Sequence, residues 1–145
     1  MPRPAAWRLS PDAYPHRDAI QTRFQDLDVL GHLNNVAFAA LFESGRTRFN
    51  HAAQLWGHGA RGRRAVVAQM EINYLAEGRY PDDVEIATGI GEVGNRSWQI
   101  LAAMFQGGQC LATCDVTIVM DKDEAGGGLP DEFKAGLAKW RLTAA

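Results

Sequence analysis

The sequence predicts an α+β domain in which one long helix packs against an antiparallel sheet. From position 35 to about position 55, apolar or small residues recur at spacings of three and four, which is typical of a helix. Four strands are expected after it, over residues 66–74, 84–93, 97–106 and 109–120, and consecutive strands joined by short turns favour an antiparallel sheet. The 145 residues match one ordinary domain, so we expect a single unit over residues 1–145.

The chain before the sheet is expected to begin loosely and then to form a strand and the helix. Residues 1–16 are rich in Pro and Ala without a clear period, which predicts a loosely held arm. Residues 20–24 alternate as a half-buried strand does. Asn34 and Asn35 mark the helix start, because their side-chain oxygens can accept from an unpaired backbone N–H. Residues 36–42 are apolar on every side, so we expect protein to surround them.

The later strands and the C-terminal segment also have clear signals. Gly107 and Gly108 predict a tight hairpin, because glycine adopts the positive φ that the favoured hairpin turns require. The alternate positions from Cys110 to Met120, Cys114 included, are expected to share one core face. Along a strand the two cysteine Cα atoms would lie ~13 Å apart, too far for a disulfide, which needs about 4.4–6.8 Å. A short amphipathic helix is expected within residues 129–141.

Composition excludes several classes of protein. Hydrophobic residues make up 46% and charged residues 22%, which is close to the globular average. No apolar run approaches the roughly 20 residues of a spanning helix, and the first residues lack the apolar stretch of a signal peptide, so we expect a cytoplasmic protein without a membrane partner. The net charge of -2 gives no basic excess for a nucleic-acid backbone.

The segment before the helix carries the residues best suited to chemistry. Asp28 could act as a nucleophile or as a general base. The first N–H groups of a helix are unpaired and lie at the positive end of its dipole, so the start near Asn35 could hold a developing oxyanion. Gly31 would let the intervening loop turn sharply. A carboxylate and an oxyanion donor on the two sides of one loop predict attack on a carbonyl.

The run RFQDLDVLGHLNN at residues 23–35 resembles the signature of hotdog-fold acyl-CoA thioesterases of the 4-hydroxybenzoyl-CoA thioesterase type. The resemblance extends to FESGR at residues 42–46, INYL at 72–75 and GNRS at 94–97, and so covers roughly residues 18–121. It implies a hotdog fold, in which an antiparallel sheet wraps around one long central helix. The implied activity is hydrolysis of an acyl-CoA or acyl-carrier-protein thioester to a free acid and a thiol.

The resemblance also implies roles and partners. Asp28 would be the catalytic carboxylate, and the backbone N–H aligned with Asn35 would bind the thioester carbonyl. The enzyme would need no metal and no organic cofactor beyond the coenzyme A of its substrate. It would be a homodimer with sites at the subunit interface, or a tetramer built as a dimer of dimers. The benzoyl-specific members carry a proline where this chain has Val29, which favours the general acyl-CoA branch and an aliphatic acyl group.

Further candidates each have a structural alternative. His32 is a catalytic candidate that could orient Asp28 or the attacking water or contact the acyl group, and its alternative is a structural residue. Asp26 has a setting like that of Asp28, with a hydrogen bond to the loop as the favoured interpretation. Glu43 could reach the site or pair with Arg46 at i+3, and pairing is favoured because an unpaired buried carboxylate is costly. The remaining substrate-binding candidates are the loop residues Gly31 and Asn34 and the turn residues Arg96 and Ser97. Arg96 and the basic cluster at Arg61, Arg63 and Arg64 could meet coenzyme A phosphates, but a solvated surface is the favoured interpretation for any single arginine.

Two other functions stay open at the level of sequence. A non-catalytic acyl-CoA-binding or regulatory domain could use the same cleft, although a binder has no need of an ionised carboxylate beside the thioester. A hotdog enoyl-thioester hydratase would use a closely spaced Asp and His, which Asp28 and His32 echo faintly.

Overall fold

The computed structural model describes residues 3–55, 65–121 and 127–144. Its five strands are β1 (His16–Ile20), β2 (Ala65–Tyr74), β3 (Val84–Val93), β4 (Ser97–Gln106) and β5 (Gln109–Met120), and its helices are α1 (Asn35–Ala52) and α2 (Asp131–Ala138). Short 3-10 helices form η1 (Ala6–Leu9), η2 (Pro11–Ala13) and η3 (Phe24–Asp26). The strands pair antiparallel in the order β1-β3-β4-β5-β2. The predicted α+β fold, one long helix on an antiparallel sheet, is confirmed.

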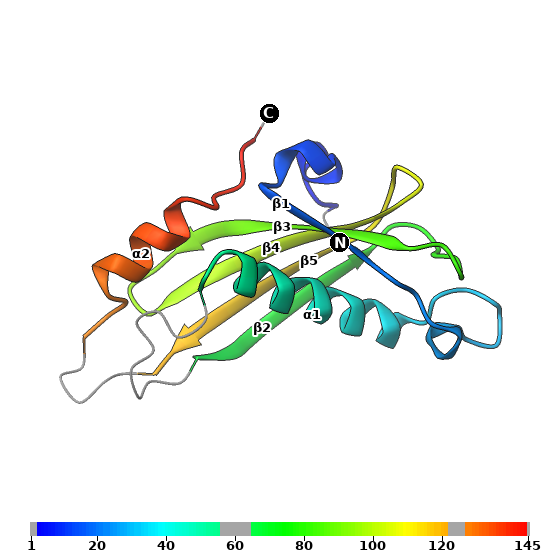
Figure 1. The fold of residues 1–145 in the computed structure, drawn as a ribbon, viewed down its shortest axis with the longest axis horizontal. Helices are drawn as coiled ribbons and strands as arrows, with labels where there is room; N and C mark the ends of the chain where they lie inside the picture. Colours follow the sequence, from blue (N-terminus) through cyan, green and yellow to red (C-terminus); the bar gives the residue numbers. More distant parts are fainter. Residues whose placement is uncertain (1–2, 56–64, 122–126, 145) are drawn as a thin grey trace.

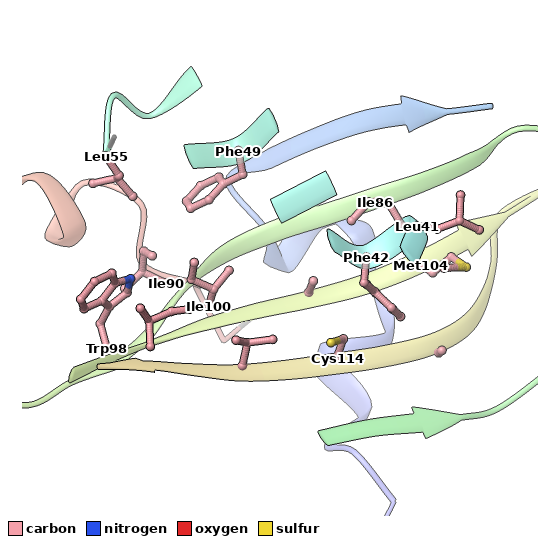
Figure 2. Packing of buried hydrophobic residues seen from close by; sticks show 14 of the residues in the cluster. Leu41, Phe42, Phe49, Leu55, Ile86, Ile90, Trp98, Ile100, Met104 and Cys114 are labelled. Carbon is pink, nitrogen blue, oxygen red and sulfur yellow. The ribbon is translucent and has the colours of Figure 1, made fainter. Parts of the chain in front are cut away.

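α1 lies across one face of the sheet, with the loop that precedes it at one end and α2 at the other (Figure 1). It contacts β1, β3 and β4. Phe42 and Phe49 point from α1 into the core, against side chains such as Ile86 and Ile100 (Figure 2). Gly45 allows this close approach, because a Cβ there would overlap the side chain of Ile86.

The side of α1 that faces away from the sheet is open in the chain. Val36 at its first turn is 76% exposed, and Glu43 also faces solvent. The expectation that protein surrounds the first turns is therefore not met within one chain. Apolar residues on every side of a helix indicate that protein shields it from water, but they do not show whether the same chain or a second chain does so.

Two elements differ from the sequence prediction. The strand expected at residues 20–24 lies earlier, at His16–Ile20, and η3 occupies Phe24–Asp26. The buried side chain of Asp26 explains η3, because its carboxylate accepts from the backbone N–H of Arg23 at 2.8 Å and closes a helical turn.

The arm expected to be loose is packed on the sheet. η1 and η2 lie on the face opposite α1, where Tyr14 joins a small cluster with Ala87, Ala103 and Phe105. The buried Arg8 donates to the Asp115 carboxylate at 2.6 Å and to the Tyr14 hydroxyl at 2.8 Å. This ion pair spans 107 positions of sequence, so no local pattern announces it.

The two cysteines lie on opposite faces of β5. Met104 pairs with Ala112 and Phe105 with Cys110, so one extra residue in β5 forms a bulge. The bulge turns Cys110 to the face beneath the N-terminal segment, whereas Cys114 stays in the main core. The prediction that both share one face is wrong for Cys110. Both thiols are free, as expected, and burial raises the pKa of each, that of Cys114 to about 12.

The C-terminal helix is confirmed and shorter than the range expected for it. α2 begins after Pro130, and its Phe133 ring meets Trp98 of β4 with centroids 4.9 Å apart. In the part of the chain that the structure describes, no helix is long and apolar enough to cross a membrane.

Candidate active site

The loop before α1 is a small closed turn. Leu27 and Leu33 form an isolated antiparallel bridge, and the Asp28 N–H donates to the His32 carbonyl at 2.9 Å. The Gly31 N–H donates to the Asp28 carbonyl at 3.1 Å, and Gly31 has φ +83°, the left-handed conformation that glycine adopts most readily. The sharp turn predicted for Gly31 is therefore present.

The carboxylate of Asp28 is half-buried and oriented by its own loop. Its Oδ1 accepts from the backbone N–H of Leu30 at 2.9 Å and from that of His32 at 3.3 Å. No hydrogen bond among the described residues uses Oδ2. One oxygen thus fixes the side chain, while the other is available to a substrate or a water.

Asp26 anchors the loop. Its Oδ1 accepts from Arg23 Nη2 at 2.8 Å, its Oδ2 accepts from the Arg23 backbone N–H, and its carbonyl accepts from the Asn34 N–H at 2.8 Å. With both carboxylate oxygens engaged and the side chain buried, Asp26 has the structural geometry that the sequence favoured for it.

The cap at the start of α1 leaves the backbone N–H of Asn35 without a hydrogen-bond partner among the described residues. The Asn34 side-chain oxygen accepts from the Val36 N–H at 2.9 Å, which is the cap predicted for Asn34. The Asn35 N–H enters no hydrogen bond of the described residues. It lies at the positive end of the helix, where an oxyanion is stabilised.

Tyr74 is a neighbour of the candidate site that the sequence did not single out. It ends β2, and its hydroxyl donates to the Asn35 carbonyl at 3.3 Å while its ring packs on Phe38 with centroids 5.3 Å apart. This contact ties the edge strand to the first turn of α1. In the sequence, Tyr74 stands at the end of an alternating strand and within the INYL segment of the family resemblance, but neither signal reveals a partner 39 residues away.

The loop after β2 supports the Asp28 loop from the side. The Leu33 N–H donates to the Gly78 carbonyl at 3.1 Å, and His32 Nε2 lies 3.1 Å from Glu77 Oε2. The imidazole of His32 therefore meets Glu77, and only its backbone meets Asp28. Glu77 is a second neighbour of the site that sequence patterns did not indicate.

Glu43 lies farther along α1 and pairs with Arg46, as the favoured interpretation had it. Glu43 Oε2 is 3.8 Å from Arg46 Nη2, and the Glu43 side chain is exposed whereas that of Arg46 is buried. Eight residues at ~1.5 Å of rise place Glu43 about 12 Å along the axis from Asn35. The pair flanks the site but does not reach the Asp28 loop.

Arg96 and Ser97 lie at the other end of the sheet in the same chain. Ser97 starts β4 and pairs with Val119, whereas Gln106 ends β4 and contacts Arg79 near the Asp28 loop. A ten-residue strand spans about 30 Å. One chain therefore does not bring these two candidates to Asp28. Arg61, Arg63 and Arg64 fall outside the described residues.

The site as built contains a carboxylate and a helix terminus but no cluster of metal ligands. Groups of three or more His, Cys, Asp or Glu side chains placed to hold a metal ion are absent from residues 3–55, 65–121 and 127–144. Asp28 Oδ2 and the Asn35 N–H bracket a loop whose tip exposes Val29 and Leu30. The arrangement suits attack by oxygen on a carbonyl carried by a partly apolar substrate.

Comparison with known proteins places the chain among thioesterases. Residues 22–140 match a family model described as the thioesterase-like superfamily. No curated protein matches the sequence.

Solved structures similar to the chain come from several bacteria. A Pseudomonas aeruginosa protein has a TM-score of 0.78 and 24% identity over 93% of this chain and 97% of that one. A predicted thioesterase from Bacillus stearothermophilus has a TM-score of 0.76 and 27% identity, over 89% of this chain and 98% of that one. A Thermus thermophilus thioesterase, complexed with coenzyme A and Zn, has a TM-score of 0.74 and 26% identity, over 88% of this chain and 94% of that one.

Proposed function

The chain belongs to the thioesterase-like superfamily, and from that premise we propose that it hydrolyses acyl-CoA thioesters with Asp28 as its catalytic carboxylate. The observation that carries the proposal is that Asp28 Oδ2 and the Asn35 N–H lie on the two sides of one loop and that neither has a hydrogen-bond partner among the described residues. Coenzyme A is the favoured carrier because a 26% identical thioesterase is complexed with it. The turn at Gly31 and the cap at Asn34 would hold this geometry around the bound thioester.

The reaction follows from what each group can do. The thioester carbonyl oxygen would accept from the Asn35 N–H, which stabilises the negative charge that develops there. Asp28 Oδ2 would then either attack the carbonyl carbon, giving a mixed anhydride that water hydrolyses, or remove a proton from an attacking water. In both routes the carbon–sulfur bond breaks, the sulfur leaves as thiol, and the acyl group leaves as acid. His32 would contribute through its backbone N–H, which helps to orient the carboxylate.

The acyl group we propose is aliphatic. Val29, Leu30 and Val36 expose apolar side chains beside Asp28 and the helix start. An alkyl chain that covered them would remove this surface from water, which stabilises the complex by about 25 cal/mol per Å² buried.

The functional unit we propose is a homodimer joined at β2, with the tetramer as a further assembly. β2 is an edge strand of ten residues, and its Val66, Val67 and Met70 side chains are 43%, 47% and 39% exposed. A long apolar edge is a template for pairing with a second chain. A two-fold axis at β2 would reverse the partner's sheet, so that the partner's Arg96 and Ser97 would approach this chain's site, and Glu43 would face the interface.

The activity is tested by thiol release from a panel of acyl-CoA and acyl-carrier-protein thioesters of different chain lengths. We expect release with aliphatic substrates. Saturable acyl-CoA binding without release at any chain length would instead favour the non-catalytic binding domain. Formation of a hydroxyacyl thioester from a crotonyl thioester would favour the hydratase.

The dimer is tested separately by Met70→Lys, measured by light scattering after size-exclusion chromatography. Because Met70 is partly exposed in the chain, the substitution should leave the fold intact and yield a monomer with little activity. Lys134→Met, a surface change on α2, is the matched control and should leave the assembly unchanged. A Met70→Lys protein that stays dimeric would contradict the proposed interface.

A further inference from the structure

A groove runs between the end of β1 and the side of α1 that faces it. Its volume is about 360 Å³, and it is lined by Ile20, Gln21, Arg23, Ala40, Leu41, Ser44 and Arg48. The segment that leaves β1 runs beside α1 toward the helix start (Figure 1). The groove therefore lies along α1 from Ala40 to Arg48, beside the segment that leads from β1 to the Asp28 loop.

The lining of the groove carries two cations and no carboxylate. Arg48 contacts Asp18 through Nη1 only, at a long 3.4 Å, and none of the hydrogen bonds in the described structure uses its Nε or Nη2. Arg23 is held by Asp26 through Nε and Nη2, which leaves Nη1 without a partner among the described residues. Several N–H donors of both guanidinium groups are thus available to an anion.

The remaining walls are suited to a group that is part apolar and part polar. Ile20 and Leu41 are buried apolar side chains, and Ala40 adds a methyl group at the rim. The Ser44 hydroxyl and the Gln21 side-chain amide form no hydrogen bonds among the described residues, so both can bind a ligand. A phosphopantetheine arm carries this combination next to its phosphate, where a dimethyl carbon adjoins a hydroxyl group.

The position of Arg48 matches the reach of that arm. Arg48 lies thirteen positions after Asn35, or about 20 Å along the axis at ~1.5 Å per residue. A helical side chain leans toward the N-terminus, which brings the guanidinium about one turn nearer to the helix start. Roughly 13 bonds join sulfur to phosphorus in an extended arm, which at ~1.25 Å of advance per bond spans about 16 Å.

From these observations we propose that Arg48, with Arg23, binds the phosphate of the substrate's phosphopantetheine arm, which lies in this groove. The inference rests on the proposed function, because it places the thioester of the same arm at Asn35 and Asp28. The phosphate is common to coenzyme A and to an acyl-carrier protein. Asp18 holds Arg48 in the free protein and competes with the phosphate for it.

A second cavity that is lined in part by arginines does not meet these conditions. It has a volume of about 420 Å³ and includes Arg8 and Arg141 in its lining. Arg8 is committed to Asp115 and Tyr14, and the cavity lies on the face of the sheet opposite α1. A thioester held at the helix start could not extend an arm through the sheet to reach it.

The test compares substrates with and without the phosphate. One acyl group is supplied as its coenzyme A thioester, its carrier-protein thioester and its pantetheine thioester, which lacks the phosphate. Arg48→Gln should raise KM about tenfold for the phosphate-bearing substrate that the wild type prefers, and leave KM for acyl-pantetheine unchanged. Asp18→Asn should lower KM for the same phosphate-bearing substrate, because it frees Arg48.

Arg17→Gln is the matched control. Arg17 lies on β1 outside the groove and is paired with Asp12 at 2.9 Å, so its loss should change neither KM. An Arg48→Gln protein with equal changes for both substrate types, or with none, would overturn the phosphate site while leaving the thioesterase activity standing. A wild-type protein that releases thiol from none of the substrates would instead overturn the proposed function.

Discussion

Gly78 couples the loop after β2 to the Asp28 loop, and replacing it with alanine tests that coupling. The Gly78 carbonyl accepts from the Leu33 N–H at 3.1 Å. A Cβ at Gly78 would lie 2.5 Å from Leu33 Cδ1 and 3.2 Å from Leu111 Cδ1. Both leucine side chains are buried, at 5% and 0% exposure, so neither can move aside without displacing its neighbours.

The expected cost of Gly78→Ala follows from this overlap. One methyl group forced into a packed core costs about 1–3 kcal/mol. For a chain of this length each 1 kcal/mol lowers Tm by about 3 °C, so calorimetry should show a fall of about 3–9 °C. Because Leu33 closes the turn that holds Asp28, we also expect kcat to fall about 10- to 100-fold, since a misplacement of ~1 Å can cost about 100-fold.

Gly136→Ala is the control for this substitution. A Cβ at Gly136 in α2 would lie 3.7 Å from Leu55 Cδ2, which is an ordinary contact. Alanine in a helix is favoured over glycine by about 0.5–1 kcal/mol, so Tm should rise slightly and kcat should stay unchanged. A Gly78→Ala protein with a lowered Tm and a wild-type kcat would refute the link from Leu33 to Asp28, and an unchanged Tm would refute the packing argument.

Three further outcomes follow from the structure. Tyr74→Phe removes the hydroxyl that donates to the Asn35 carbonyl. Steady-state kinetics should show kcat reduced about 3- to 10-fold, the effect of losing a ~1 kcal/mol hydrogen bond. An unchanged kcat would contradict a role of Tyr74 in positioning the helix start. Arg8→Ala leaves the Asp115 carboxylate without its ion pair, and thermal unfolding should show a loss of about 2 kcal/mol; no loss would mean that the N-terminal segment is not held by this pair. Because burial raises the pKa of the Cys110 and Cys114 thiols, both stay protonated at pH 8 in the folded protein, so thiol reagents should label them only after unfolding; rapid labelling of the native protein would contradict this.

Most of the helices and strands could be predicted from patterns that are local in the sequence. Four strands and both helices fall where periodicity and glycine or proline signals put them, because burial of one face imposes the spacing directly. The same rule misplaced the first strand, since the alternation at residues 20–24 continues into a turn that Asp26 closes. The same rule placed Cys110 on the wrong face of β5. The bulge adds one residue to the strand and so turns the side chains before it to the opposite face, and the amino-acid pattern gives no sign of the bulge.

The site was predictable only as far as its residues are close in sequence. Asp28, Gly31, Asn34 and Asn35 lie within eight positions, and the turn and the helix cap expected there are present. The thioester hydrolase class expected from the same segment is confirmed by the family that the chain matches. Tyr74 and the loop after β2, with Glu77 and Gly78, come from distant segments, and no spacing rule links them to the helix start.

Arg96 and Ser97 show a second limit of prediction from the sequence. Their resemblance to the family's turn suggested a place at the substrate, but the chain's own sheet separates them from Asp28 by the length of β4. A sequence motif can indicate that residues belong to one site, but it does not indicate which subunit of an oligomer supplies each residue. Their role therefore stays a prediction tied to the dimer.

The central claim is that Asp28 performs the chemistry, and Asp28→Asn tests it most directly. Asparagine keeps a side-chain oxygen that can accept from the Leu30 N–H, so circular dichroism and Tm should match the wild type. Thiol release from an acyl-CoA substrate should fall by about 10²- to 10⁴-fold, the usual contribution of such a group. A folded Asp28→Asn protein that releases thiol at the wild-type rate would contradict the account.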